Sequence, residues 1–95
     1  LYVVDDDDAV RGSYGALFLS RGHVVRAFAD GASFLAAADH TQAGCVLLDL
    51  RMDGLSGLQV FDELLARHSF IQTVFLSGHG ELPSAVEAVR RGAFD

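Results

Sequence analysis

Short apolar runs alternate along the chain with segments whose apolar residues recur at helical spacing. The runs are rich in β-branched residues and apolar at nearly every position, which is typical of strands that are covered on both faces. They predict strands at Leu1–Val4, Val24–Phe28, Cys45–Leu48 and Thr73–Leu76. Each of these four runs is therefore expected to form a strand.

Each of these runs is followed by a helical stripe of apolar residues. The four stripes are Val10, Tyr14, Leu17 and Phe18; Phe34, Leu35 and Ala38; Leu58, Phe61, Leu64 and Leu65; and Leu82, Val86 and Val89. Asp30 is placed to cap the second helix, and Ser56 with Gln59 forms the S-x-x-Q capping box of the third. Strands alternating with helices predict a doubly wound α/β fold with a parallel, flavodoxin-like sheet.

Composition narrows the class of protein. The 95 residues suit one small domain, and half of them are apolar. The formal net charge of −6 argues against direct binding of nucleic acid, which needs a surplus of Arg and Lys. The single cysteine, Cys45, fits a small core residue in a reducing compartment, and no apolar run has the length of a membrane span. We therefore expect a cytoplasmic protein.

Polar residues follow three of the predicted strands. Asp5 and Asp6 follow the first, Asp49 the third and Ser77 the fourth. In a flavodoxin-like sheet the first and third strands flank the point where strand order reverses, which is where ligands bind. Crowded carboxylates favour a divalent cation such as Mg²⁺, and a carboxylate beside such a metal can accept a phosphoryl group as an acyl phosphate.

Three stretches with this spacing resemble the receiver domain of bacterial two-component response regulators: LYVVDDDDAVR, CVLLDLRMDGLSGL and VFLSGHGELPSAVEAVRRGAFD. The resemblance covers essentially the whole chain and is closest to FixJ-type receivers, which usually precede a LuxR-like helix-turn-helix domain. It implies the strand order 2-1-3-4, with the family's fifth strand and helix missing from this chain. An output domain that binds DNA is then expected beyond residue 95.

The resemblance also implies a role for each site residue. Asp49 matches the phosphoacceptor, which is phosphorylated by a sensor histidine kinase. Asp6 matches the direct ligand of Mg²⁺, Asp5 the acid that acts through its hydration shell, and Arg51 the position whose backbone carbonyl completes the metal site. Ser77 matches the hydroxyl that hydrogen-bonds the phosphoryl group. Phosphorylation would then switch an output surface, with a homodimer as one expected consequence.

The chain departs from the family pattern at several positions. Asp53 stands where the family usually has Pro, and Glu81 where related chains often have Asp. The family's Lys that pairs with the phosphoryl group, and its aromatic switch residue, would lie beyond Asp95. The missing Lys leaves open a degenerate receiver that acts as an unphosphorylated interaction module, although the intact acidic pair and Asp49 argue against it.

A second family also resembles the opening motif. Haloacid-dehalogenase-like phosphohydrolases carry a D-x-D motif, in which Asp5 would be the nucleophile and Asp7 the general acid. On the receiver interpretation, Asp7 and Asp8 instead favour the start of a helix and do no chemistry. The remaining polar side chains have plainer expectations: His79 shapes the rim of the site, and His23, His40 and His68 face solvent.

Overall fold

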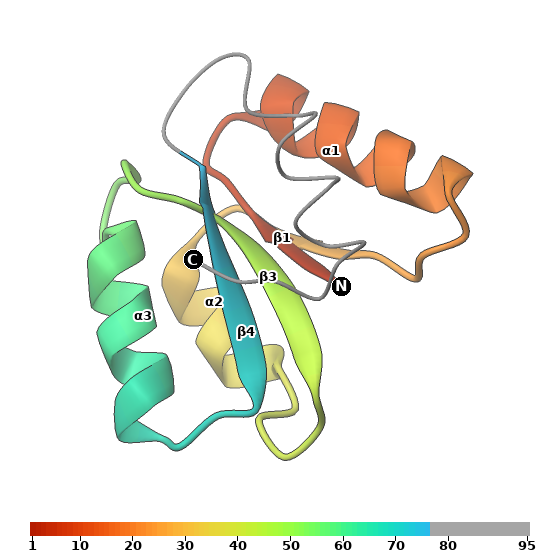
Figure 1. Ribbon diagram of the computed structural model, residues 1–95. Coiled ribbons are helices and arrows are strands. Elements are labelled where there is room, and N and C mark those ends of the chain that lie inside the picture. Colours follow the sequence, from red (N-terminus) through yellow and green to blue (C-terminus); the bar gives the residue numbers. More distant parts are fainter. Residues whose placement is uncertain (77–95) are drawn as a thin grey trace.

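A parallel four-stranded sheet lies at the centre of the computed structural model, which describes residues 1–76 (Figure 1). The described elements are β1 (Tyr2–Val4), α1 (Asp8–Ser20), β2 (Arg26–Phe28), α2 (Gly31–Ala37), β3 (Gly44–Asp49), α3 (Gly57–Ala66) and β4 (Ile71–Leu76). The strand order is β2-β1-β3-β4, as predicted. The expected helix over Leu82, Val86 and Val89, together with Ser77, His79 and Glu81, lies outside the described residues.

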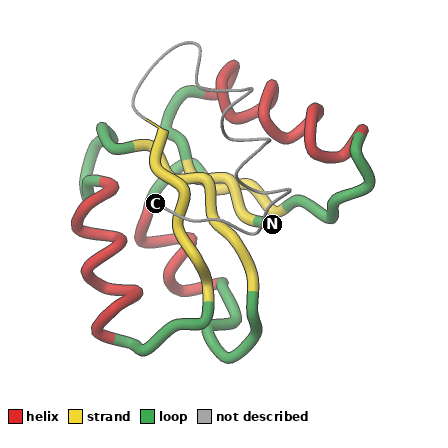
Figure 2. Tube along the Cα trace, viewed as in Figure 1, coloured by secondary structure: helices red, strands yellow, loops and turns green. Residues whose placement is uncertain are grey.

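Helices cover both faces of the sheet (Figure 2). On one face, Tyr14 and Phe18 of α1 pack against Val3, Leu47, Val74 and Leu76. On the other face, α2 and α3 pack against a second apolar cluster, whose buried members are Val4, Phe34, Leu35, Val46, Leu48, Val60, Leu64 and Ile71. Neighbouring strand residues such as Val3 and Val4 thus enter different clusters, which explains why these runs are apolar throughout.

The register of the strands aligns their carboxyl ends. Val4 pairs with Leu48 of β3, and Asp49 pairs with Leu76 of β4. The residues that follow β1 and those at the end of β3 are therefore neighbours at one edge of the sheet. This edge is where the polar residues of the sequence were expected to meet.

Local capping chemistry fixes where the helices begin. Asp7 is the N-cap of α1 and accepts hydrogen bonds from the amides of Ala9 and Val10. Asp30 accepts from the Ser33 amide at the start of α2, and both bonds of the Ser56–Gln59 capping box are present at α3. The predictions for Asp30 and for the Ser56–Gln59 capping box are confirmed, whereas Asp7 was expected in the first turn of the helix and is its N-cap. Each cap satisfies amide donors that have no partner within their own helix.

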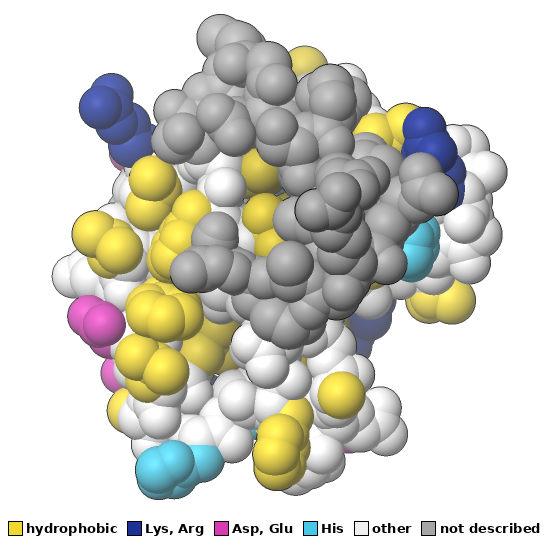
Figure 3. Space-filling view, viewed as in Figure 1, with side chains coloured by type: hydrophobic (Ala, Val, Ile, Leu, Met, Phe, Trp, Pro, Cys, Tyr) yellow, Lys and Arg dark blue, Asp and Glu magenta, His cyan; other side chains and the backbone are white. Residues whose placement is uncertain are grey.

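The predicted apolar stripe of α3 is partly wrong. Leu58 and Leu65 are 58% and 59% exposed, whereas Val60 and Leu64 are buried. The core-facing side of α3 is centred on residues 57, 60 and 64. Leu58 and Leu65 each follow one of these residues in sequence, so the helical turn carries them away from the sheet. Figure 3 shows hydrophobic side chains at the surface over this part of the molecule.

Two further expectations are corrected at the opposite end of the sheet and in the loops. The predicted strand Val24–Phe28 is shorter, because only Arg26–Phe28 pair with β1, and Val24 is 80% exposed. His40 is only partly exposed: its ring nitrogens lie 2.8 Å from Ser69 Oγ and 3.0 Å from the Leu35 carbonyl oxygen. His23 packs edge-on against Phe18.

His68 is exposed, as expected. Cys45 lies in β3 and packs against the α1-side cluster, and burial raises the pKa of its thiol to about 11. The thiol is therefore protonated at neutral pH, which agrees with its predicted place in the core. Among the described residues, no helix has the length and apolar character needed to span a membrane.

Candidate functional site

Three carboxylates meet at the carboxyl ends of β1 and β3. Asp5 and Asp6 follow β1 directly, and Asp49 is the last residue of β3. One carboxylate oxygen from each of the three lies within 4.8 Å of the others. Asp5 is 5% exposed, Asp49 is partly buried and Asp6 is exposed. The sequence prediction that these residues converge is therefore confirmed, whereas Ser77 lies outside the described residues.

Asp5 is the most tightly held of the three. Its amide donates to the Phe28 carbonyl at 3.2 Å, and its Oδ1 accepts from the Asp7 amide at 2.9 Å. Burial raises the pKa of the Asp5 carboxyl, the Asp7 amide bond opposes that shift, and the charges of Asp49 and Asp6 raise the pKa further. The folded chain thus holds a carboxylate in a place where its charge is poorly compensated.

The loop between β3 and α3 closes on Asp6. The backbone amide of Asp53 donates to Asp6 Oδ2 at 3.2 Å, although 47 residues separate the two in sequence. A proline at position 53, which the receiver pattern favours, has no amide hydrogen to give. Asp53 therefore permits a backbone bond between this loop and the β1–α1 turn.

Asp49 is oriented by the loop that follows it. Its Oδ1 accepts from the Arg51 amide at 3.1 Å, which forms a local turn of the Asx type. The Leu50 amide donates to the Leu76 carbonyl at 3.1 Å, so the end of β3 stays attached to β4. The Arg51 residue itself is exposed, and its role through the backbone carbonyl stays a prediction.

The run of four aspartates divides in two. Asp7 caps α1, and Asp8 forms an ion pair with Arg11 inside the first turns of that helix. Neither belongs to the group of three carboxylates, as the receiver interpretation predicted. The phosphohydrolase alternative needs Asp7 as a general acid, but its Oδ1 accepts two helix amides and faces α1.

The donor set fits a hard divalent cation. All three side chains offer oxygen atoms. Burial first, and then the charges of Asp49 and Asp6, raise the pKa of Asp5, and a cation would compensate the charge of its carboxylate. Mg²⁺ prefers oxygen ligands and commonly uses one or two carboxylates together with waters. The sequence alone assigns no role to the Asp53 amide or to Arg11, whose guanidinium donates to the Asp5 carbonyl oxygen. Each of these bonds involves a backbone group, which every residue has, and only the tertiary structure brings the partners together.

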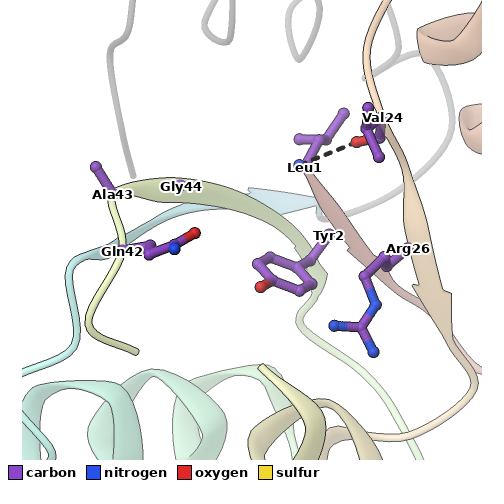
Figure 4. A pocket seen from close by; sticks show the side chains of 7 residues that line it. All are labelled: Leu1, Tyr2, Val24, Arg26, Gln42, Ala43 and Gly44. Atoms are coloured by element: carbon purple, nitrogen blue, oxygen red, sulfur yellow. Dashed lines mark hydrogen bonds between the residues drawn. The ribbon is translucent and has the colours of Figure 1, made fainter. Parts of the chain in front are cut away.

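A separate pocket lies at the opposite, amino-terminal end of the strands (Figure 4). It is lined by Leu1, Tyr2, Val24, Arg26, Gln42, Ala43 and Gly44 and holds about 210 Å³. The Arg26 guanidinium lies 6.0 Å from the centre of the Tyr2 ring and 5.5 Å from that of Phe28. The Arg26 guanidinium is thus already packed against aromatic rings. The carboxylate cluster lies at the other end of the sheet.

Comparison with known proteins indicates the same family as the sequence motifs. The family model for the response regulator receiver domain matches residues 1–95. The C4-dicarboxylate transport transcriptional regulatory protein DctR of Rhodobacter capsulatus is 43% identical over 97 residues, which cover the whole chain and 49% of DctR. The transcriptional regulatory protein FixJ of Azorhizobium caulinodans is 43% identical over 95 residues, again the whole chain and 45% of FixJ.

A solved structure of the response regulator StyR superposes with a TM-score of 0.78 at 39% identity, covering 97% of this chain and 46% of StyR. The chain therefore spans about half the length of the relatives that it matches. The motifs, the strand order, the carboxylate cluster and these matches agree. The chain belongs to the response regulator receiver domain family.

Proposed function

We propose that this chain is the phosphoacceptor receiver of a two-component response regulator, and that Asp49 accepts a phosphoryl group from a phosphohistidine of a sensor kinase. The observation that carries the proposal is the meeting of Asp5, Asp6 and Asp49 at the ends of two adjacent parallel strands. It supplies an oxygen nucleophile and the ligands for a cation in one place.

The chemistry assigns a simple task to Asp49. One of its carboxylate oxygens attacks the phosphorus atom, the phosphorus–nitrogen bond to histidine breaks, and an acyl phosphate forms on Asp49. The Arg51 amide holds Oδ1, which leaves Oδ2 as the oxygen that we assign to the attack. The receiver promotes this transfer to itself and turns over no separate substrate, so it acts as a signalling switch.

The other two carboxylates prepare the site. Asp6 would bind Mg²⁺ directly, Asp5 through its hydration shell, and the Arg51 carbonyl and Asp49 would complete the set. When bound, Mg²⁺ neutralises negative charge on the phosphoryl group during transfer. The poorly compensated charge of buried Asp5 supports this assignment, because a nearby cation would stabilise it. Ser77 would hydrogen-bond the transferred group.

The wider role is proposed from the relatives. DctR and FixJ are named transcriptional regulatory proteins, and this chain matches about half of each. In the whole regulator, we propose that the rest of the receiver, including the Lys of the family pattern, and then a DNA-binding output domain would follow position 95. The regulator would act in the cytoplasm, and its partners would be a sensor histidine kinase and, after phosphorylation, a second copy of the regulator.

Beryllofluoride, a mimic of the phosphoryl group, tests the assignment in the intact protein. With Mg²⁺ present, it is expected to raise the melting temperature of the wild type and of Asp62→Asn, which removes an exposed acid of α3 outside the cluster. Asp49→Asn is expected to show no response. If Asp49→Asn responds as the wild type does, the acceptor is misassigned; if the wild type does not respond, the chain fits an unphosphorylated interaction module.

A further inference from the structure

We propose that Arg11 is a positioning residue of this site, which fixes the backbone between Asp5 and Asp6 and thereby sets the affinity for Mg²⁺. The inference rests on the metal site of the proposed function. The observation behind it is a hydrogen bond of 2.8 Å from Arg11 Nη1 to the carbonyl oxygen of Asp5. That carbonyl belongs to the peptide unit that joins the two carboxylate-bearing residues.

A residue of the same helix holds the Arg11 side chain in position. Its other terminal nitrogen, Nη2, contacts the carboxylate of Asp8, three residues earlier in α1. The Arg11 side chain is 19% exposed, whereas that of Asp8 is 90% exposed. The planar guanidinium thus spans from the first turn of α1 to the end of β1, and such a fork of two bonds has a defined geometry.

The bond completes a frame around the turn. The Asp5 amide is bound to Phe28 of β2, its carboxylate to the Asp7 amide, and its carbonyl to Arg11. The peptide plane that leads to Asp6 is therefore fixed before any cation arrives. Groups that orient metal ligands in this indirect way commonly change metal affinity by about 10- to 100-fold when they are removed.

The charge of Arg11 and its bond to the Asp5 carbonyl have opposite effects on Mg²⁺ affinity, which makes the proposal testable. A positive charge beside a cation site opposes binding, so charge alone predicts that Arg11→Met binds Mg²⁺ more tightly. Loss of the carbonyl bond instead predicts weaker binding. We expect the second effect to dominate and the Mg²⁺ affinity of Arg11→Met to fall about 10-fold.

The experiment is titration of the intact protein with Mg²⁺ alone, followed by calorimetry, with NMR relaxation of the Asp6 and Asp7 amides as a second measurement. Arg21→Met is the matched control, because Arg21 is the exposed C-cap residue at the other end of α1 and the same charge is lost. It is expected to bind Mg²⁺ at least as tightly as the wild type. The two amides are expected to become more mobile in Arg11→Met and to stay unchanged in Arg21→Met.

Arg11→Lys keeps the charge but cannot reproduce the fork, so its affinity is expected to lie between those of the wild type and Arg11→Met. If the methionine variant does not fold, the lysine variant decides the matter: wild-type affinity and mobility in Arg11→Lys would overturn the proposal. Equal or tighter binding by a folded Arg11→Met would overturn it as well. Asp6→Asn separates the two claims, because undiminished Mg²⁺ binding there would refute the metal site itself.

Discussion

Gly57, the first residue of α3, lies directly against the backbone of Asp49. A Cβ atom at position 57 would meet the Asp49 carbonyl oxygen and would come within 2.8 Å of Leu50 Cα. These neighbours are backbone atoms and cannot turn aside as a flexible side chain does. The proposed phosphoryl acceptor is therefore positioned in part by a glycine that lets α3 begin this close to β3.

Gly57→Ala is expected to lower the free energy of unfolding by roughly 1–3 kcal/mol, because the added methyl group forces α3 away from the end of β3. Gly12→Ala is the matched control. A Cβ at Gly12 has open space around it among the described residues, and alanine favours a helix interior, so this variant is expected to gain about 0.5–1 kcal/mol. Urea unfolding measures both changes. Equal stability of the two variants would contradict the close approach of Gly57 to Asp49.

The raised pKa of Asp5 makes stability depend on pH. Folding favours the protonated carboxyl, so this contribution to the free energy of unfolding is fully present below the ordinary pKa of 3.8 and is lost as pH rises through the raised pKa. Without Mg²⁺, Asp5→Asn is therefore expected to be more stable than the wild type at pH 7, with the difference shrinking toward pH 3.

Added Mg²⁺ at pH 7 should stabilise the wild type more than Asp5→Asn, because the variant has lost one of the charges that a cation compensates. Urea unfolding with and without Mg²⁺ across this pH range measures both effects. An Asp5→Asn variant that is less stable than the wild type at pH 7 without metal would show that the charge of Asp5 is already compensated in the fold.

Asp7 is expected to affect stability and leave metal binding largely unchanged. Its side chain caps α1 by accepting from the Ala9 and Val10 amides, and loss of an N-cap costs about 0.5–2 kcal/mol. Asp7→Ala should therefore lower the free energy of unfolding by that amount, while its own amide still donates to Asp5. Asp6→Asn is the comparison variant, with a large loss of Mg²⁺ affinity. A comparable loss of affinity in Asp7→Ala would favour the pairing of Asp5 with Asp7.

His40 is expected to stabilise the end of the molecule that lies away from the site. Its ring bridges Ser69 and the carbonyl of Leu35, near the end of α2, so it joins the loops that precede β3 and β4. His40→Ala is expected to lower the free energy of unfolding by about 1–2 kcal/mol through loss of two hydrogen bonds. His68→Asn, at an exposed position with positive φ that asparagine tolerates, should change it little. Thermal unfolding of the two variants decides whether the bridge contributes.

Local rules account for what the sequence predicted well. Asp30 and Ser56 cap helices through bonds to residues three positions away, so the sequence spacing contains the interaction. Asp5, Asp6 and Asp49 were expected to meet because parallel strands end at the same edge of a sheet. The arrangement of the strands therefore predicts much of the site.

The remaining features depend on tertiary packing. Leu58 and Leu65 were assigned to the buried stripe of α3, but the position of the sheet selects the face of Val60 and Leu64. The bond from the Asp53 amide to Asp6 joins the backbone of one loop to a side chain of another, and it cannot be predicted from residue types. Arg11 was visible in the motif, yet the group that it binds is a carbonyl, which every residue possesses.

The central claim is that Asp49 is the residue that becomes phosphorylated. The most direct measurement treats the intact protein with Mg²⁺ and a small acyl phosphate donor, traps the acyl phosphate chemically and identifies the labelled peptide by mass spectrometry. The label is expected on Asp49, it should depend on Mg²⁺, and it should be lost in Asp49→Asn but not in Asp62→Asn, which removes an exposed acid of α3. A label on Asp5, or undiminished labelling of Asp49→Asn, would contradict it.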